Sequence, residues 1–417
     1  MIDIKKLIEN EEKFLKGFEN KKYDLKEEVN VVKEKYNNYI SVLQEEQTLR
    51  ETLNKLTAEI KNDPSKIEEI KKEASAVSSQ AKEKGNEATE LLNEINTILS
   101  HFPNIALESV VVGNGEEDNK VISIHHEELN NKNENAVPHW EVLEDGRILT
   151  EETAYISGAR HVSYKGKTAQ IVRAIEQLMI DTHLGEGVSL VEPPVMVNKE
   201  AMFNTGQLPK FEEDLFKLDN GQYLIPTAEV PVTNMVAGKI ISPEELPIRM
   251  TAATSCFRSE AGSAGRDTRG IIRLHQFRKV ELVTIGKPGE DEKDFNTILG
   301  LATSILDKLN LPYRLVELCT GDTSFGSERT VDIEVYMPGV KAYREISSVS
   351  RFGTFQSRRM KTRTKNEDGK KEFVNTFNGS GLAIERTLAA IVENYVNENK
   401  EVVVPDALKK YVDFDTF

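Results

Sequence analysis

The sequence predicts an α+β protein in which a helical hairpin precedes a domain of strands and helices. Over residues 67–98, apolar and small side chains repeat in alternating steps of three and four, the pattern of a heptad seam. Residues 254–281 contain two strand-like runs around a loop rich in Gly, Ser, Arg and Asp. After residue 169, helical periodicities and short apolar runs are interspersed, which indicates a sheet packed against helices.

Composition bounds the class of protein. The chain has 417 residues, enough for two domains, and a net charge of −15, so any nucleic-acid surface would have to be local. Two distant cysteines, Cys256 and Cys319, argue against a disulfide framework and for a reducing compartment. The start of the chain has no secretory or transit pattern, and no apolar run reaches about 18 residues. We therefore expect a soluble cytoplasmic protein without a membrane segment.

The first hundred residues predict a short helical lead-in and then two long helices. The seam of the second helix comprises Ile67, Ile70, Ala74, Val77, Ala81, Lys84, Ala88, Leu91, Ile95 and Ile98. The seam of the first comprises Val29, Val32, Tyr36, Tyr39 and Leu43, falters at Glu46 and Arg50, and resumes at Leu53, Leu56 and Ile60. The break at residues 62–65 contains Pro64. A short break between helices of similar length predicts an antiparallel pair, roughly 54 Å long.

Two uses of this hairpin fit the residues: a dimerisation or spacer coiled coil, or a projecting arm that grips a partner. Lysines near the expected tip suit contact with phosphates, although Glu59, Glu68 and Glu69 dilute them; these lysines are Lys55, Lys61, Lys66, Lys71 and Lys72. Pro103 ends the coiled coil, and polar segments follow at 113–119 and 130–135. The predicted division is an arm at 1–105, a linker at 106–135 and a second domain at 136–417.

The stretch 254–281 carries the densest candidate chemistry. We expect two strands, 254–260 and 271–281, joined by the loop 261–270. Alternation along a strand would place Arg258 with Glu260 on one face, and Arg273, Phe277 and Glu281 on one face of the second strand. A guanidinium suits phosphate, a ring suits adenine, and a carboxylate suits an ammonium or hydroxyl group. The alternative is a solvated hairpin face with cross-strand ion pairs.

Helices are expected at 169–184, before a strand at 188–191, and at 291–309, before strands at 316–318 and 331–336. Thr227 and Glu229 are polar residues in an apolar run, so they need partners or begin a helix, with Thr227 as its cap. Glu345 and Ser347 would share a face if extended, and such oxygen groups suit Mg²⁺. The alternative for that segment is an ordinary edge strand.

Residues 378–381 are expected to open a helix over 382–395. This helix is apolar nearly all round and therefore buried, so Arg386 needs an anion, either a structural carboxylate or a substrate group. The sequence has no Walker or Rossmann glycine motif and no Cys/His cluster with zinc spacing, so we expect neither of those nucleotide folds and no zinc.

These residues resemble the signature motifs of class II aminoacyl-tRNA synthetases, and seryl-tRNA synthetases most of all. The second motif is matched by Arg258-Ser259-Glu260, Ala261-Gly262-Ser263-Ala264-Gly265, Asp267-Thr268-Arg269-Gly270, His275-Gln276-Phe277 and Lys279-Val280-Glu281. The helix and strand that end at Pro193-Pro194 resemble the first motif, and residues 378–386 resemble the third. The likeness covers nearly the whole chain and is densest from 201 to 285.

The resemblance implies a mostly antiparallel sheet flanked by helices, preceded by a coiled-coil arm that grips the long variable arm of serine tRNA. It implies a homodimer that activates L-serine with ATP and Mg²⁺ to seryl-adenylate, then transfers the seryl group to the 3′ end of serine tRNA. Two alternatives remain: a class II paralogue that charges a carrier protein, and an inactive tRNA-binding paralogue. The intact arm speaks against the first, and the intact motif residues speak against the second.

The resemblance also implies roles for individual residues. Arg258 and Arg386 would be catalytic, and Glu345 with Ser348 would hold Mg²⁺. The implied ATP site is Arg258, Ser259, Glu260, Arg273, Phe277, Glu345, Ile346, Ser347, Ser348 and Arg386. The implied serine site is Thr227, Ala228, Glu229, Arg258, Glu281, Asn378 and Ser380. Three departures from the family pattern are Glu385 where a glycine is expected, the segment 349–352, and Phe377.

Overall fold

The computed structural model describes residues 1–62, 67–130, 132–261 and 269–417. Its backbone forms two compact units: a helical unit, Ile2–Glu19 with Tyr23–Phe102, and a sheet unit, Met1 with Asn20–Lys22 and Pro103–Phe417. The expected helix break at residues 63–65, Lys66 and the centre of the loop 261–270 lie outside the described residues. None of the helices in the described ranges is long and apolar enough to cross a membrane. The division at 105 and 135 stays a prediction.

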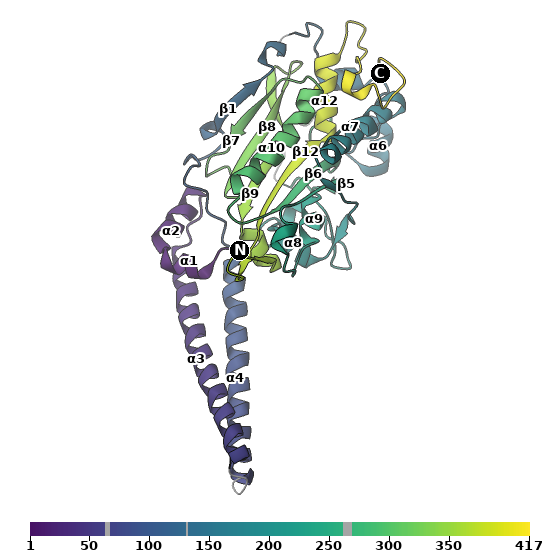
Figure 1. The fold of residues 1–417 in the computed structure, drawn as a ribbon. Helices are drawn as coiled ribbons and strands as arrows, with labels where there is room; N and C mark the ends of the chain where they lie inside the picture. Colours follow the sequence, from purple (N-terminus) through teal and green to yellow (C-terminus); the bar gives the residue numbers. More distant parts are fainter. Residues whose placement is uncertain (63–66, 131, 262–268) are drawn as a thin grey trace. The chain divides into compact units, whose positions relative to one another are not determined.

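The helical unit is an antiparallel coiled coil with a short helical lead-in, as predicted (Figure 1). Early residues of the first long helix pair with late residues of the second: Lys35 contacts Glu94 at 2.6 Å, and Glu45 contacts Lys84 at 2.8 Å. Every predicted seam residue of the second long helix is buried or half-buried. Its helices are α1 (Ile4–Glu9), the greater part of α2 (Glu11–Asn20), α3 (Lys26–Asn62) and α4 (Ile67–Leu99).

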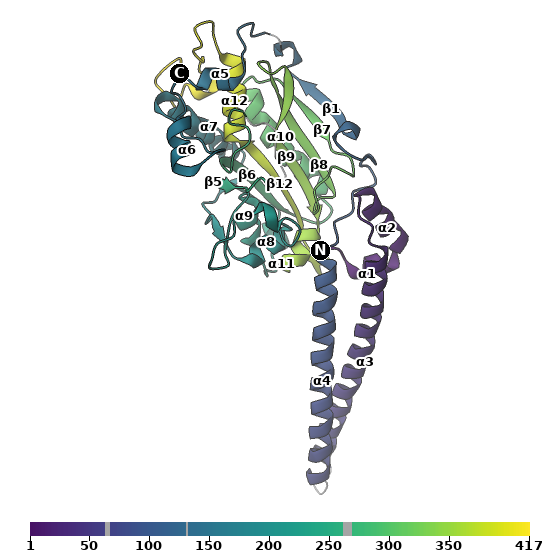
Figure 2. The same ribbon diagram turned by 180° about the vertical axis from the view of Figure 1, so that it is seen from behind.

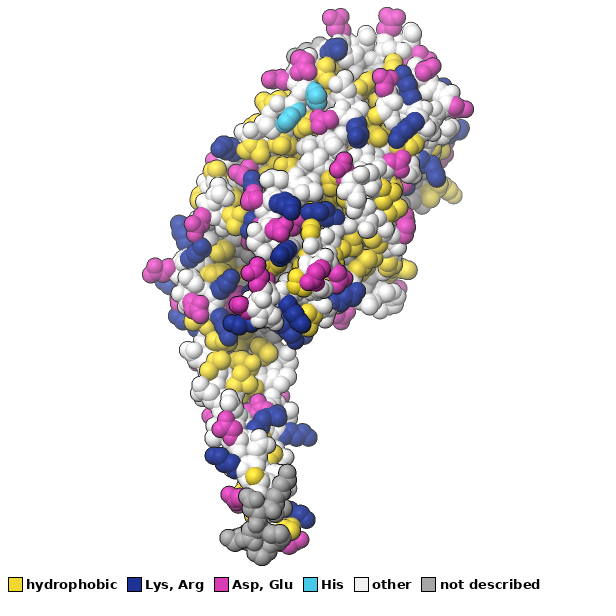
Figure 3. All heavy atoms as spheres, viewed as in Figure 1, with side chains coloured by type: hydrophobic (Ala, Val, Ile, Leu, Met, Phe, Trp, Pro, Cys, Tyr) yellow, Lys and Arg dark blue, Asp and Glu magenta, His cyan; other side chains and the backbone are white. Residues whose placement is uncertain are grey.

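The seam falters at Glu46 for a physical reason. Glu46 lies against Gly85 of α4, where an added Cβ would come within 3.1 Å of its Oε1 atom. Lys84, the polar member of the α4 seam, bonds Glu45 across the pair and Glu87 on its own helix. Polar groups therefore pair with one another at this level of the coiled coil. Figure 3 shows Lys, Arg, Asp and Glu side chains interspersed along the surface of α3 and α4.

The sheet unit is built on one eight-stranded sheet, in the order β1-β7-β8-β9-β12-β6-β5-β2 (Figures 1 and 2). Neighbouring strands are antiparallel except for β2 and β5, which are parallel, so the predicted mostly antiparallel sheet is confirmed. The strands are β1 (Lys120–His125), β2 (Ser189–Leu190), β5 (Ile248–Phe257), β6 (Gln276–Gly286), β7 (Tyr313–Glu317), β8 (Arg329–Met337), β9 (Ala342–Gly353) and β12 (Asn375–Ala383).

Three helices cover one face of this sheet (Figures 1 and 2): α7 (Gly166–Gly185), α10 (Asp291–Lys308) and α12 (Ile384–Tyr395). The core between them contains Val280 and Leu282 of β6, Val331 and Ile333 of β8, and Val349 of β9. Alternation along each strand turns the intervening side chains to the other face. The predicted helices at 169–184 and 291–309 are confirmed.

The remaining elements are short. They are α5 (His139–Leu143), α6 (Thr150–Ser157), α8 (Lys199–Thr205), α9 (Glu229–Asn234) and α11 (Phe355–Met360), with the small strands β3 (Met196–Val197), β4 (Tyr223–Leu224), β10 (Arg363–Lys365) and β11 (Lys371–Phe373). Two of them, α8 and α11, pack against each other.

The predicted strands 254–260 and 271–281 are wrong at the ends that face the loop. The ladder closes at Phe257 and Gln276. Beyond it, the N–H of Ser259 donates to the Asp214 carbonyl, and Glu260 has a φ of +54°. Arg258, Glu260 and Arg273 therefore lie outside the regular strands, so strand alternation does not determine where their side chains point.

The predicted helix opening at 378–381 is also wrong, because these residues belong to the central strand β12. Asn378 and Gly379 pair with β6 on one side and β9 on the other. The glycines here permit close packing: a Cβ at Gly381 would lie 2.2 Å from the His183 ring, and one at Gly379 would meet Ile298 and Val349 at 2.8 Å. The helix α12 begins only at Ile384 and is buried, as expected.

Candidate active site

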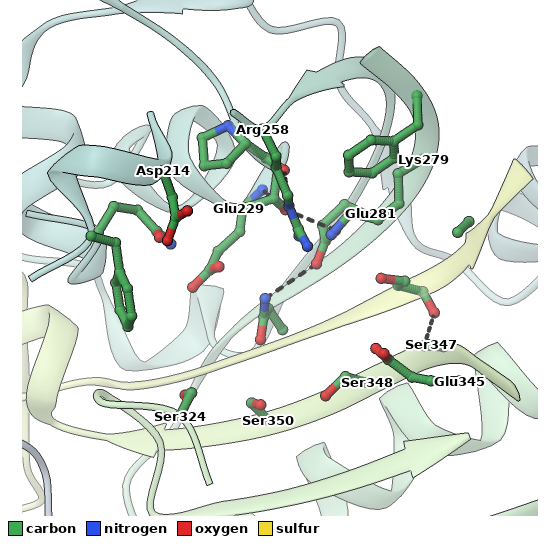
Figure 4. Close-up of a pocket in the computed structure, with 18 of the residues that line it drawn as sticks. Asp214, Glu229, Arg258, Lys279, Glu281, Ser324, Glu345, Ser347, Ser348 and Ser350 are labelled. Carbon is green, nitrogen blue, oxygen red and sulfur yellow. Dashed lines mark hydrogen bonds and ion pairs between the residues drawn. The ribbon is translucent and has the colours of Figure 1, made fainter. Parts of the chain in front are cut away.

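A cavity of about 540 Å³ opens on the face of the sheet turned away from the apolar core, and Figure 4 shows side chains that line it. All the predicted site residues line it except Ala228 and Ser259. Ala228 is fully buried in an apolar cluster, and the Ser259 hydroxyl donates to the Glu213 carbonyl at 2.7 Å. The structure therefore brings together residues that are up to 159 positions apart, from Thr227 to Arg386.

The strands β6 and β12 supply the floor of the cavity. Phe277, Lys279 and Glu281 alternate along β6, so all three side chains face the cavity while Val280 and Leu282 face the core. The predicted shared face of Phe277 and Glu281 is thus confirmed. Ser380 of β12 pairs with Glu281 across the ladder, which brings a hydroxyl beside this carboxylate.

A β-bulge decides which polar groups of β9 reach the cavity. Ser347 pairs with Ile333, but Glu345 pairs with Glu334, the next residue of β8, so Ile346 is an extra residue. The bulge breaks the simple alternation that placed Glu345 with Ser347, since it turns Glu345 and Ser348 to the same side (Figure 4). The Ser347 hydroxyl instead donates to the Ser380 carbonyl at 2.6 Å.

Glu281 is a carboxylate of the cavity wall and is only 1% exposed. Its Oε2 accepts from the Thr227 hydroxyl at 3.0 Å and from the Lys279 ammonium at 2.6 Å. Its Oε1 accepts from the Asn378 amide at 3.2 Å. The Thr227 oxygen also accepts from the Glu229 N–H at 3.2 Å, but Ala228 is the N-cap residue of α9, so the expected cap at Thr227 is wrong.

Glu229 is a second buried carboxylate in the same wall. Its Oε1 accepts from the Gln356 amide at 2.6 Å. Burial raises its pKa to about 7, and the nearby charge of Glu281 adds to this rise. Two carboxylates in one buried pocket provide acceptors for the ammonium and hydroxyl groups of a small amino acid.

Guanidinium groups line the same cavity. Arg258 lies over the Phe277 ring at 5.2 Å. Arg386 bonds the Glu345 carboxylate at 3.1 Å and the Glu345 carbonyl at 2.7 Å, and Arg273 bonds Glu260 at 2.6 Å. Cations beside a half-buried aromatic ring that lines the cavity suit the phosphates and the base of a nucleotide.

The alternative interpretation of the stretch 254–281, a hairpin face with ion pairs, therefore describes part of this site. Arg273 and Glu260 pair with each other, and Arg386 has a carboxylate partner. Burial opposes ionisation of Glu345, but Arg386 and then Arg258 lower its pKa below the ordinary value. Because Glu345 stays ionised beside Arg386 and Arg258, its carboxylate can bind a metal cation that is coordinated by the phosphates of a nucleotide.

Sequence reasoning missed several lining residues. Lys279 stands one alternation step from Phe277 and from Glu281, and that spacing was the available signal. Asp214 and the segment 324–326 gave no comparable signal, because only the tertiary fold brings them to the cavity.

Comparisons with known proteins agree with this site. Residues 1–106 match the seryl-tRNA synthetase N-terminal domain, and residues 211–395 match the class II tRNA synthetase core domain for Gly, His, Pro, Ser and Thr. The serine–tRNA ligase of Mycoplasmopsis agalactiae is 41% identical over 424 residues, covering 100% of this chain and 99% of its own length. That of Campylobacter jejuni is 43% identical over 418 residues, covering 99% of this chain and 100% of its own length. The chain belongs to the seryl-tRNA synthetase family.

The solved structures support the family assignment. Seryl-tRNA synthetase from Pyrococcus horikoshii, complexed with ATP, superposes with a TM-score of 0.89 at 30% identity, over 100% of this chain and 99% of that one. Prolyl-tRNA synthetase from Giardia lamblia shares the fold at 15% identity and a TM-score of 0.57, over 66% of this chain and 56% of that one. The predicted class II synthetase fold and family are therefore confirmed.

Among the departures from the seryl-tRNA synthetase pattern, two have a packing explanation. Phe377 is 1% exposed, and an added Cβ at Gly286 would lie 2.7 Å from its ring. In the segment 349–352, Val349 and Phe352 are buried, and the Ser350 hydroxyl bonds the Thr330 hydroxyl at 3.0 Å. The third, Glu385, is a buried carboxylate at the rim of the site.

Glu385 holds the backbone of β6. Its two oxygens accept from the Arg278 N–H at 3.1 Å and 3.0 Å, next to the aromatic residue Phe277. Burial raises the pKa of Glu385 to about 7, although the hydrogen bond from Arg278 opposes this rise. A folded-state pKa above the unfolded value means that Glu385 contributes stability below about pH 4.5, and that this is lost as pH rises through 7.

Glu385→Gln should therefore raise the melting temperature more at pH 8 than at pH 5. Glutamine keeps an oxygen acceptor for Arg278 and does not ionise, so it avoids the penalty that grows between about pH 4.5 and 7. Thermal unfolding of both proteins across pH 5–8 tests this, with the exposed Glu367→Gln as the matched control. A difference between the variant and the parent that stayed constant with pH would contradict it.

Proposed function

We propose that this chain catalyses ATP-dependent activation of L-serine to seryl-adenylate and transfer of the seryl group to the 3′ end of serine tRNA. The observation that carries the proposal is a single cavity in which acceptor carboxylates face guanidinium groups, in a chain with full-length serine–tRNA ligase relatives. We propose the cytoplasm as the compartment, as expected from the sequence.

In the first step, a serine carboxylate oxygen attacks the α-phosphorus of ATP, and the bond to the β-phosphate oxygen breaks to release pyrophosphate. Arg258 and Arg386 neutralise the charge that develops on the phosphates. Phe277 stacks on adenine, and the Arg258 guanidinium lies over the Phe277 ring. We assign Ser259, Glu260, Arg273, Ile346 and Ser347 to the surrounding nucleotide site. The reaction is accelerated by positioning of serine and ATP and by stabilisation of the phosphate charge, so no strong base is required.

Mg²⁺ fits the donor groups of β9. Glu345 and Ser348 present a carboxylate and a hydroxyl on one side, and magnesium uses one or two such groups together with substrate phosphates. Ser348 is hydrogen-bonded to Asp332, whose Oδ1 is buried without a protein partner. Burial and then the Glu345 charge raise the pKa of Asp332 well above its ordinary value. The ion would neutralise phosphate charge when bound with ATP.

The serine pocket is proposed to lie between β6, β12 and α9. Thr227, Glu229, Glu281, Asn378 and Ser380 line it, with Ala228 behind them and Arg258 at its phosphate side. Groups that bond the serine hydroxyl reject alanine by about 10⁴, because a polar group is then left unpaired. Threonine keeps the hydroxyl and adds a methyl group, so only steric exclusion opposes it.

In the second step, the terminal ribose hydroxyl of the tRNA attacks the carbonyl carbon of seryl-adenylate, and AMP leaves. We propose that α3 and α4 hold the long variable arm of serine tRNA, since the N-terminal match covers both helices. Of the predicted phosphate contacts, Lys55, Lys71 and Lys72 are exposed on these helices. Lys66 lies outside the described residues, as does the side chain of Lys61.

We also propose a homodimer. Exposed apolar side chains on α6, β2 and β3 support it: Tyr155 is 94% exposed, Ile156 74%, Leu190 40% and Met196 51%. The helix α7 and the strand β2 are the pair that resembles the first class II motif. A carrier-protein ligase would have no use for the coiled-coil arm, and an inactive paralogue would not need the cavity groups described above.

The direct test is serine-dependent ATP–pyrophosphate exchange with purified protein, Mg²⁺ and no tRNA. Exchange with serine is expected to exceed exchange with alanine by about 10⁴-fold or more, and threonine is expected to give weak but measurable exchange. Charging of serine tRNA then tests the second step. Absence of serine-dependent exchange would favour the inactive paralogue, and undetectable threonine activation at high concentration would overturn the steric argument.

A further inference from the structure

Gln356 of α11 contacts the proposed serine pocket from behind. It is 1% exposed and does not line the cavity. Its Nε2 donates to Glu229 Oε1 at 2.6 Å and to the Thr205 carbonyl at 3.2 Å. Its Oε1 accepts from the Thr376 hydroxyl at 2.7 Å. Every polar atom of this buried amide is therefore bonded, and each bond goes to a different segment of the chain.

These partners determine which way the amide points. The Thr205 carbonyl oxygen accepts hydrogen bonds and cannot donate, so it requires the NH₂ group of Gln356 on its side. Thr376, 0% exposed, donates from the opposite side to the amide oxygen. Gln356 consequently presents an N–H donor to Glu229, and a flipped amide would lose its bonds to the Thr205 carbonyl and to Glu229.

The helix that carries Gln356 is bonded to another segment of the cavity wall. On the same helix, Arg359 donates to the Phe203 and Leu208 carbonyls at 2.8 Å, and its guanidinium lies 4.6 Å from the Phe203 ring. Arg359 thus ties α11 to the segment 203–208, whose residues Thr205, Gly206 and Gln207 line the cavity. Thr376 lies in β12, between β6 and β9.

We propose that Gln356 is a positioning residue for serine recognition, because it holds Glu229 by one oxygen and leaves the other carboxylate oxygen for the substrate. Thr376 orients the Gln356 amide, so the chain Thr376–Gln356–Glu229 links the central strand to the pocket. This inference rests on the proposed role of Glu229 in binding serine.

The charge of Glu229 depends on this arrangement. The N–H of Gln356 stabilises the ionised carboxylate, as do Lys279 of β6 and Arg258 after β5, whereas burial and Glu281 of β6 oppose ionisation. An ionised Glu229 is the better acceptor for a serine ammonium or hydroxyl group. Loss of the Gln356 donor should therefore weaken binding of serine and leave ATP binding unchanged.

The test compares Gln356→Met, Gln356→Glu and Thr376→Val with the parent in ATP–pyrophosphate exchange. Gln356→Met is expected to raise the KM for serine about 10- to 100-fold, the range for a hydrogen bond to a charged group, with the KM for ATP within about twofold. In the plot of kcat/KM for serine against pH, the fall on the acid side should occur at higher pH in Gln356→Met than in the parent. Thr376→Val should give a smaller change in the same direction, and Thr376→Ser should restore the parent value.

The controls separate positioning from loss of structure. Gln47→Met, on the exposed surface of α3, is the matched substitution and should change neither KM. Gln356→Glu is nearly isosteric and places a second carboxyl group against Glu229, so its serine KM should rise steeply with pH, even if Gln356→Met does not fold. Unchanged serine KM, or equal changes in the KM for serine and for ATP, would overturn the inference. Absence of exchange in the parent would overturn the proposed function instead.

Discussion

Replacing Arg386 by alanine should lower serine-dependent ATP–pyrophosphate exchange by about 10³-fold, with most of the loss in kcat. Arg386 projects from the first turn of the buried helix α12, is 23% exposed at its side chain, and reaches the backbone and carboxylate of Glu345. A preorganised cation at developing phosphate charge contributes about 3–4 kcal/mol to the transition state, which corresponds to two to three powers of ten.

The same substitution has a structural consequence that can be separated from the chemistry. Without the Arg386 guanidinium, the Glu345 carboxylate loses the cation that does most to lower its pKa. The KM for ATP should rise and its Mg²⁺ dependence should change. Arg386→Lys, which keeps the charge without the planar fork, should recover only part of the rate.

The matched control is Arg50→Ala, because Arg50 is an exposed arginine of α3 that pairs with Glu46 on its own helix. Exchange without tRNA should be unchanged in that variant. If Arg386→Ala retained more than about a tenth of the parent rate, the assignment of Arg386 to the ATP phosphates would be wrong, and the ion pair with Glu345 would be structural.

Shortening the coiled coil should remove tRNA charging and leave serine activation intact. Glu45 of α3 contacts Lys84 of α4, so the two helices face each other at this level. The hairpin can therefore be shortened just beyond this contact by replacing residues 50–81 with a short Gly-Ser turn. The part of the seam that remains keeps its buried members, including Val29, Val32, Ala88 and Ile95. The expected result is a fall of at least about 100-fold in kcat/KM for tRNA, equivalent to ~2.8 kcal/mol of lost binding.

The readout that decides this prediction is the ratio of the two activities. Exchange with serine and ATP should remain within about twofold of the parent, and circular dichroism should lose only the helix that was deleted. A parallel variant with Lys55, Lys71 and Lys72 changed to alanine tests the phosphate contacts, and its charging rate should depend less on salt than that of the parent. If the shortened protein charged tRNA as well as the parent, the hairpin would be a spacer and would not bind tRNA.

Periodicity alone predicted the elements whose neighbours are close in sequence. The heptad seam of α4 was read from ten positions, and each of them is buried or half-buried. The helices α7 and α10 were likewise predictable, because an apolar stripe at helical spacing needs no knowledge of its partner. The polar residues Thr227 and Glu229 stood out for a related reason, since polar groups in an apolar run require partners wherever they lie.

Local signals failed where a backbone group has a distant partner. The pattern around Gly379 and Gly381 predicts the opening of a helix, but both glycines lie in a central strand. Glycine is needed there because His183, Ile298 and Val349 leave no room for a Cβ. The bulge at Ile346 is invisible in the sequence, although it decides that Ser348 lies beside Glu345. The strand ends at 257 and 276 depend on backbone partners in other segments.

The sequence by itself determined the coiled coil, the main helices, the motif residues and the family to which they belong. Only the tertiary structure decided which distant partner each buried carboxylate has: Thr227 for Glu281, Arg278 for Glu385, and Gln356 for Glu229. The physical reason is that side-chain periodicity is a property of neighbouring residues. The hydrogen bonds that a buried carboxylate accepts depend on segments that only the folded sheet brings within 3 Å.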